Sequence, residues 1–306
     1  MSLSKVHNLE FKSPPLIVIV GETASGKTAA AIEIAKKVNG EIICADSRTV
    51  YTGLPVSTAK PSKSEQQNVP HHLIDIIDPV DRYTAAQFKL QAEQLVTDIS
   101  GRGKIPIIVG GTGLYVDSVL FNFQFRRSGS EELREELNSL TVEQLLKVAH
   151  SKGITKQKLV EPNKRRLIRT IETNGEESGR AALRPNTHLA ALSLSREELY
   201  KRIEARVEAM IEFGLATEIQ NFAAKYGWDN HLITSDAHKA VQNYENKTGT
   251  IDNVRLAFTK RDKHLAKRQR TWFARNKSIV WHNRPEDLIH EATDFILKQK
   301  NSIRSA

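Results

Sequence analysis

The sequence predicts an α/β protein with a P-loop core, a parallel sheet with helices on both faces, and a small all-helical insertion domain. The first observation is that apolar runs alternate with helical patterns. Strands are expected at Leu16–Val20, Gly40–Asp46 and Lys104–Gly113, and helices at Thr28–Val38 and Tyr83–Gly103. Because the strand runs are continuously apolar, each strand is expected to be covered on both faces, as parallel strands are.

The second observation is the loop GETASGKT, Gly21–Thr28, between the first strand and the first helix. It matches G-x-x-x-x-G-K-[ST] at every position. Glycines let backbone amides surround phosphate oxygens, and the following helix presents its positive N-terminal end. Lys27 adds a charge for these oxygens, and the Thr28 hydroxyl can hold Mg²⁺. The motif predicts a polyphosphate ligand and leaves its organic part open.

The third observation is a change of character at residues 121–195, where strand signals vanish and short charged segments begin with capping boxes. These boxes pair Ser128 with Glu131 and Thr141 with Gln144. We therefore expect a helical insertion domain at 121–195, within a core made of 1–120 and 196–306. The apolar run Thr187–Ser195 could return as a strand.

Two long helices are expected in the last third of the chain. A capping box of Ser195 and Glu198 opens the first. The second covers about residues 253–276, and its apolar stripe is Val254, Phe258, Leu265 and Trp272. Basic side chains cover much of its remaining surface: Lys260, Arg261, Lys263, Lys267, Arg268 and Arg270.

Composition narrows the class of protein. The net charge of +9 over 306 residues favours a polyanionic partner. One cysteine, Cys44, excludes an internal disulfide and any zinc site built on several thiolates. No apolar run approaches the ~20 residues that span a membrane, and the first residues show no signal-peptide pattern. A cytoplasmic protein without membrane contact is expected, and nothing suggests an obligate dimer, so a monomer is expected.

Polar side chains follow two of the expected strands. Asp46 ends the second strand, and Thr112 lies in the GGTG turn, Gly110–Gly113, that ends the third. Ligands of α/β sheets gather at these carboxyl ends. Asp46 could hold Mg²⁺ as in a kinase, or it could act as a general base beside a leaving group.

Together these segments resemble the bacterial tRNA dimethylallyltransferases, also called tRNA isopentenyltransferases. The matching segments occur in family order over about residues 16–282: GETASGKT, ADSRTVYTGL, STAKPS, PHHLIDIIDP, YTAAQF, GKIPIIVGGTGLY, NKRRLIRTIE, ELYKRIEARVEAMIEFGLATE and LAKRQRTWF. The resemblance implies transfer of a dimethylallyl group from dimethylallyl diphosphate to the N6 amine of the tRNA adenosine 3′ of the anticodon. The loop would then hold a leaving diphosphate, with Mg²⁺ as the cofactor.

The resemblance also implies roles for particular residues. Catalysis would use Asp46 as the base, with Thr112 and Lys27, and Thr28 would hold Mg²⁺ with diphosphate oxygens and waters. The residues implied for diphosphate binding are Gly21, Thr23, Ala24, Ser25, Gly26, Lys27, Thr28, Lys263 and Arg268. The residues implied for tRNA binding are Asp46, Ser47, Arg48, Thr49, Thr112, Arg165, Arg166, Arg169 and Tyr244. The insertion would contact the anticodon stem-loop.

The chain departs from the family pattern at three places. Glu22 stands where the family loop usually has proline, and VQNYEN, with Gln242 and Asn243, replaces an Ile-Gly-Tyr segment. Asp262-Lys263-His264 replaces Thr-Arg-Gln, so a lysine takes the place of an arginine that could bind a phosphate through two nitrogens; Arg261 or Arg268 would compensate.

Other function classes fit fewer of these segments. An adenylate isopentenyltransferase, which prenylates AMP, ADP or ATP, would not need the basic insertion and helix. A kinase leaves GGTGLY unexplained, and a non-enzymatic RNA-binding protein does not need Lys27. A divergent paralogue of low activity is the remaining alternative.

Overall fold

The computed structural model describes residues 13–126, 129–154, 163–176 and 179–304. The described chain forms two compact units. The second is Phe121–Leu183, and the first contains the residues on either side of it. No helix among the described residues is long and apolar enough to cross a membrane.

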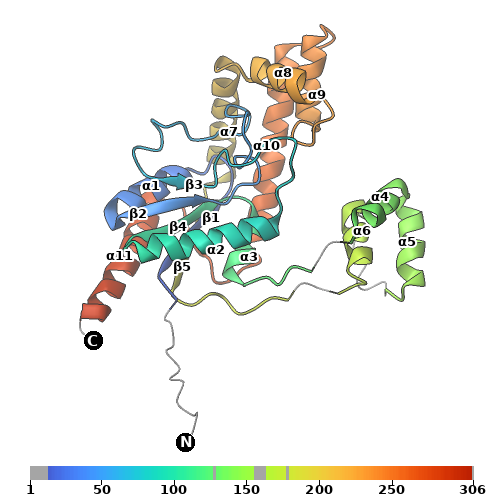
Figure 1. Ribbon diagram of the computed structural model, residues 1–306. Coiled ribbons are helices and arrows are strands. Elements are labelled where there is room, and N and C mark those ends of the chain that lie inside the picture. Colours follow the sequence, from blue (N-terminus) through green and yellow to red (C-terminus); the bar gives the residue numbers. More distant parts are fainter. Residues whose placement is uncertain (1–12, 127–128, 155–162, 177–178, 305–306) are drawn as a thin grey trace, which may run out of the picture. The chain divides into compact units, whose positions relative to one another are not determined.

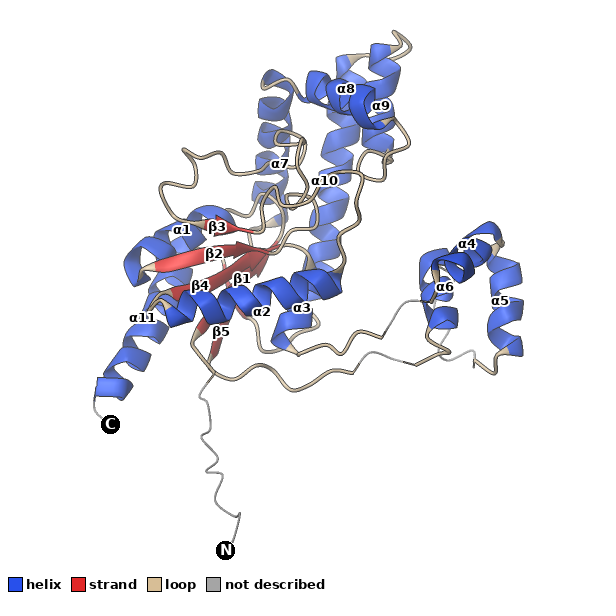
Figure 2. Cartoon of the chain, in the orientation of Figure 1, coloured by secondary structure: helices blue, strands red, loops and turns tan. Residues whose placement is uncertain are grey.

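The first unit is built on one parallel sheet. Within the described residues it has six strands in the order β3-β2-β4-β1-β5-β6; Figure 2 labels β1 to β5. The strands are β1 (Leu16–Gly21), β2 (Gly40–Cys44), β3 (His71–His72), β4 (Ile105–Gly110), β5 (Thr187–Leu192) and β6 (Val280–His282). Every residue of β1 and β4 is buried, which confirms the strands expected at these apolar runs.

Helices cover both faces of the sheet, as expected (Figure 1). On one face α1 (Lys27–Val38) packs beside α11 (Pro285–Arg304) over an apolar cluster that includes Ile17, Ile107 and Leu192. On the other face lie α2 (Ala85–Gly101) and α3 (Gly113–Leu120). Thr84 and Gln87 form a capping box at the start of α2.

Beyond the carboxyl ends of the central strands, the remaining helices of the first unit pack together (Figure 1). They are α7 (Arg196–Glu212), α8 (Leu215–Tyr226), α9 (Asp236–Glu245) and α10 (Ile251–Phe273). The Ser195 hydroxyl accepts the Glu198 amide and caps α7 as predicted, but the Glu198 side chain binds Arg202 and does not complete the predicted capping box. Because α10 also contacts β1 and α3, it connects this helical layer to the sheet.

The buried stripe of α10 differs from the expected one. Val254 and Phe258 are buried as predicted, but Leu265 and Trp272 are only half-buried. The stripe continues through Asp262, Ala266, Gln269 and Phe273. Two of these side chains are polar, and the bonds they make, described below, explain their burial.

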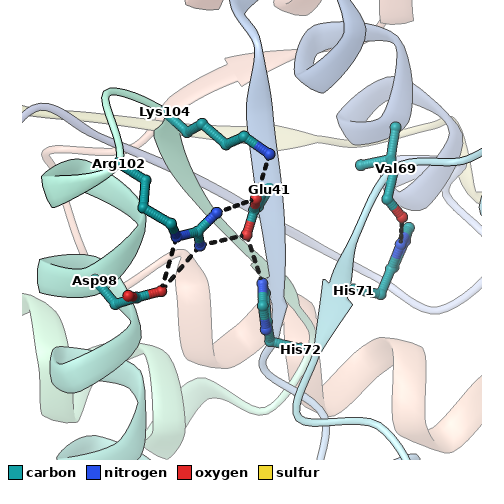
Figure 3. Close-up of polar contacts among 7 residues, drawn as sticks. All are labelled: Glu41, Val69, His71, His72, Asp98, Arg102 and Lys104. Atoms are coloured by element: carbon teal, nitrogen blue, oxygen red, sulfur yellow. Dashed lines mark hydrogen bonds and ion pairs between the residues drawn. The ribbon is translucent and has the colours of Figure 1, made fainter.

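An ion cluster holds the edge strand β3 to the sheet at the start of β2 (Figure 3). The buried Glu41 carboxylate accepts two bonds from the Arg102 guanidinium, at 2.6 and 2.8 Å, one from Lys104 at 2.6 Å, and contacts His72 at 2.8 Å. Arg102 also binds Asp98 on α2. These bonds, those of Arg102 first, hold the pKa of Glu41 well below its usual value, although burial opposes them. The cluster joins β2, β3, α2 and Lys104, the residue that precedes β4.

The second unit is helical, as expected. Its helices α4 (Glu131–Ser139), α5 (Val142–Ser151) and α6 (Lys164–Glu172) surround a small apolar core that includes Leu137, Leu145 and Ile168. Thr141 and Gln144 form the predicted capping box of α5. Ser130 caps α4, whereas Ser128, the predicted cap, lies outside the described residues.

The expected end of the insertion, at residue 195, is wrong. The second unit ends at Leu183, and Thr187–Leu192 is β5, which pairs with β1 over its whole length. The apolar run that could return as a strand therefore belongs to the core.

Candidate active site

A cleft of about 860 Å³ opens at the carboxyl ends of β1, β2 and β4. Its lining comes from the phosphate loop, the turns after β2 and β4, the segment 54–61, and helices α7, α9 and α10. Ligands of parallel sheets bind at this edge. The structure thus brings Lys27, Thr28, Asp46 and Thr112 to one cavity.

The phosphate loop begins α1 in the manner expected of an anion site. Gly26 has φ 95°, a left-handed conformation that glycine adopts without steric cost, and it is the N-cap of α1. Lys27 Nζ donates to the Glu22 carbonyl oxygen at 3.1 Å. Burial lowers the pKa of Lys27 to about 8, with Arg206 adding to the effect and Asp46 and Glu22 opposing it. A bound anion would favour the charged amine.

Gln269 of α10 joins the phosphate loop to the turn after β4. Its Oε1 accepts the Thr23 amide at 2.7 Å, and its Nε2 donates to the Gly111 carbonyl oxygen at 3.2 Å. A Cβ at Gly111 would lie 2.0 Å from Gln269 Nε2, so this close contact requires glycine. The Thr23 amide is therefore engaged by the protein, although Thr23 itself lines the cleft.

Glu22 does not line the cleft. Its carboxylate is buried and contacts the Ser193 hydroxyl at 3.5 Å and Arg270 of α10 at 3.4 Å. Burial raises the pKa of Glu22, and Arg270 opposes the rise. The acid that departs from the family pattern is thus turned away from the phosphate site and paired.

Ser47, which follows Asp46, links the turn after β2 to Thr112 in the turn after β4. The Asp46 Oδ1 accepts the Arg48 amide at 2.8 Å and the Thr49 amide at 3.3 Å. The Thr112 hydroxyl oxygen accepts the Ser47 amide at 3.0 Å. Both backbone bonds to Asp46 use Oδ1, so neither occupies Oδ2. The Asp46 and Thr112 side chains line the same cleft.

A second positive group lies in the cleft. Arg206 of α7 and Arg261 of α10 both bind the fully buried Asp262, at 2.5 Å through Oδ2 and 2.8 Å through Oδ1. The Arg206 Nε is buried without a hydrogen-bond partner among the described residues. Asp262, one of the departures from the family pattern, thus orients two cleft arginines.

The other residues expected at the diphosphate divide into two groups. Arg268 lines the cleft with Ala24, whereas Lys263 does not. Lys263 Nζ binds Glu204 at 2.6 Å and lies over the Tyr200 ring. Its expected phosphate contact is not supported by this position. Gly21 and Ser25 are buried in the loop itself.

The residues expected at tRNA lie on both units. In the first unit, Arg48 is exposed, Thr49 is buried, and both line the cleft; Tyr244 is exposed on α9 and is not in the lining. In the second unit, Arg165 and Arg166 are exposed at the start of α6. There Arg169 instead binds Glu172 and the Arg126 carbonyl oxygen. The cleft lining includes residues that were not predicted from the sequence, among them Arg206, Gln269, Ser57 and His238.

These features define a P-loop protein in which a carboxylate lies beside a phosphate site. The chain matches the family model described as IPP transferase over residues 49–277, and the model described as isopentenyl transferase over residues 14–77. It belongs to the IPP transferase family, which confirms the resemblance seen in its sequence.

Named relatives agree with this membership. A tRNA dimethylallyltransferase from Macrococcus caseolyticus is 37% identical over 295 residues, which are 92% of this chain and 95% of that protein. A tRNA dimethylallyltransferase 2 from Geotalea uraniireducens is 40% identical over 288 residues, 89% of this chain and 93% of that protein.

Solved structures extend the similarity to the fold. The crystal structure of a tRNA isopentenylpyrophosphate transferase from Bacillus halodurans has a TM-score of 0.71 and 33% sequence identity. The match covers 96% of this chain and 100% of the chain in that structure. A structure of a eukaryotic dimethylallyltransferase acting on tRNA has a TM-score of 0.70 and 26% sequence identity. The match covers 85% of this chain and 70% of the chain in that structure.

Proposed function

We propose that this protein transfers the dimethylallyl group of dimethylallyl diphosphate to the N6 amine of the tRNA adenosine 3′ of the anticodon. The N6–carbon bond forms as the carbon–oxygen bond to diphosphate breaks, and N6 loses a proton. The observation that carries the proposal is that one cleft holds both the phosphate loop and the Asp46–Thr112 pair. Family membership and the names of the relatives support it.

The phosphate loop would stabilise the leaving diphosphate. Negative charge grows on its oxygens as the carbon–oxygen bond breaks. Lys27, the amides at the start of α1 and Arg206 are among the donors that line the cleft. The hydroxyl of Thr28 is a hard oxygen ligand that suits Mg²⁺, with diphosphate oxygens and water completing the ligands. Bound Mg²⁺ would neutralise charge on the diphosphate.

Asp46 would accept the proton from N6. Its Oδ1 is held by two backbone amides, so Oδ2 is the oxygen assigned to the proton. The Thr112 hydroxyl, oriented by the Ser47 amide, would hydrogen-bond the base or the diphosphate. Because N6 becomes more acidic as it bonds to carbon, a carboxylate is a sufficient base.

The tRNA would present its target adenosine extruded from the stack, which costs least in a single-stranded anticodon loop. Arg48 in the first unit and Arg165 and Arg166 in the second are exposed cations suited to phosphates. We assign the second unit, Phe121–Leu183, to the anticodon stem-loop. The monomeric state and the cytoplasmic location stay predictions.

Mass spectrometry of nucleosides tests the proposal. An anticodon stem-loop incubated with dimethylallyl diphosphate and Mg²⁺ should yield N6-dimethylallyladenosine, and AMP offered in its place should yield none. Asp46→Ala should abolish the product while stem-loop affinity stays within a few-fold. Full activity of Asp46→Ala would remove Asp46 from the base role, and preferential modification of AMP would favour an adenylate isopentenyltransferase.

A further inference from the structure

Three polar side chains in the cleft have so far been paired with no particular ligand atom, and only Thr49 among them was expected at tRNA. Ser57, His238 and Thr49 all line the cleft and are 4%, 7% and 8% exposed. The hydroxyl oxygens of Ser57 and Thr49 are buried, and in the part of the chain that the structure describes they have no hydrogen-bond partner. Buried polar groups are nearly always bonded. Two unpartnered hydroxyls in one cleft therefore indicate a ligand that bonds to them.

The backbone of Ser57 is fixed from two sides. Its amide donates to Glu218 Oε1 of α8 at 2.8 Å, and the Val56 amide donates to Glu218 Oε2 at 2.6 Å. Arg261 of α10 donates to the Ser57 carbonyl oxygen at 3.3 Å. Since both main-chain groups of Ser57 are engaged, its hydroxyl is the group left for a ligand, which it reaches by rotation about χ1.

His238 adjoins the same arginine. The His238 ring and the Arg261 guanidinium both pack on the Phe258 ring, at 5.7 and 4.1 Å from its centroid. His238 Nδ1 lies 2.7 Å from the Ser235 hydroxyl. Burial, together with the charges of Arg261 and Arg48, lowers the pKa of His238 to about 3. The ring is therefore neutral near pH 7. Because Nδ1 is engaged by the Ser235 hydroxyl, Nε2 is the ring nitrogen left for a ligand, and it is a donor when Nδ1 accepts from Ser235.

The third group connects this end of the cleft to the reaction centre, because the Thr49 amide donates to Asp46 Oδ1. Leu54 and Leu232 supply apolar surface in the same lining. The Arg261 guanidinium is engaged by the Asp262 carboxylate, which it shares with Arg206, and by the Ser57 carbonyl oxygen. A ligand here is thus a neutral, partly apolar group with polar edges, which describes a nucleobase better than a phosphate.

We propose that Thr49, Ser57 and His238 are specificity-determining residues that bond the ring nitrogens of the extruded adenine. This inference rests on the proposed function. An adenine with N6 at Asp46 still carries the acceptors N1, N3 and N7, and burying them unpaired would be costly. Two hydroxyls and a neutral imidazole supply donors for these acceptors without adding charge.

The test combines base analogues with protein variants. Anticodon stem-loops carry 1-deaza-, 3-deaza- or 7-deazaadenosine at the target position, so that each keeps N6 and loses one ring acceptor. For the unaltered protein, at least one analogue should lower kcat/KM about tenfold, the size of one ordinary hydrogen bond. Ser57→Ala, Thr49→Val or His238→Gln should lower kcat/KM for adenosine by a similar factor.

The decisive measurement combines a base analogue with a protein variant in one reaction. The analogue that lacks the bonded nitrogen should react equally fast with the unaltered protein and with the variant that lacks its partner, because that bond is already lost. Ser64→Ala, on an exposed serine, is the matched control and should leave every rate unchanged. The proposal is overturned if no analogue is slowed, or if variant and analogue losses multiply in every combination. Absence of product from the unaltered stem-loop would instead refute the proposed function.

Discussion

Replacing Asp262 by asparagine perturbs the cleft in a way whose size follows from the structure. The carboxylate is fully buried and binds Arg206 and Arg261. Asparagine keeps the shape and can accept one of the two bonds, but it leaves two positive charges without their counter-ion. A bond to a charged group contributes about 1.5–3 kcal/mol, and breaking a buried pair costs about 3–5 kcal/mol. The arginine side chains are 27% and 23% exposed, so water offsets part of the loss, and we expect Asp262→Asn to lower the free energy of unfolding by about 2–3 kcal/mol.

Urea denaturation at pH 7 measures this loss. Asp252→Asn is the matched control, because Asp252 lies on the same helix and forms an exposed ion pair with Arg255; surface pairs contribute about 0–1 kcal/mol. Saturating diphosphate with Mg²⁺ should stabilise Asp262→Asn more than the unaltered protein, since the bound anion takes the place of the missing charge. Equal stability of the two variants, or an equal effect of diphosphate on Asp262→Asn and the unaltered protein, would refute this reasoning.

Three further predictions concern stability, pH and the phosphate loop. The depressed pKa of Glu41 stabilises the fold at pH values above the usual carboxyl pKa of 4.5. The unaltered protein should therefore exceed Glu41→Gln in free energy of unfolding by the largest amount at pH 7, and the difference should shrink as the pH falls below 4.5. A difference that does not change with pH would contradict this prediction. Because the pKa of Lys27 is about 8, calorimetry should show diphosphate affinity falling from pH 7 to pH 9, more steeply than in Lys27→Met; parallel profiles would exclude Lys27 as the cause. Gln269→Ala removes the bonds to Thr23 and Gly111. Chemical denaturation should show a free energy of unfolding lower by about 1–3 kcal/mol, and steady-state kinetics should show a higher KM for dimethylallyl diphosphate. An unchanged KM would refute the role of Gln269 in shaping the loop.

The regular elements could be predicted wherever local sequence decides them. The buried strands β1 and β4 are continuous apolar runs, and the caps at Thr84 and Thr141 are local side-chain bonds. The end of the insertion could not be predicted in this way. Thr187–Leu192 is a strand because it pairs with β1, and β1 lies far away in the sequence.

The buried polar residues of α10 show a second limit of prediction from sequence. Hydropathy favours Leu265 and Trp272 as core residues, but Asp262 and Gln269 are the more deeply buried side chains. Their burial depends on Arg206 and on the Thr23 amide, and helix periodicity carries no information about such distant partners.

Some residues of the candidate site could also be predicted from local sequence, and others could not. Lys27, Asp46 and Thr112 belong to contiguous motifs at strand ends, so parallel-sheet geometry brings them together. Arg206, Ser57 and His238 come from α7, the segment after β2, and α9, and only the packing of these elements places them in the cleft. Lys263 was assigned by resemblance alone, and its position is set by Glu204.

The most direct measurement counts diphosphate released against dimethylallyl groups transferred, with an anticodon stem-loop, dimethylallyl diphosphate and Mg²⁺ in the absence of ATP. If the phosphate loop holds the leaving group, one diphosphate should appear for each modified adenosine, and added ATP should be neither required nor hydrolysed. Diphosphate release that requires ATP, or that occurs without any modified adenosine, would contradict the account.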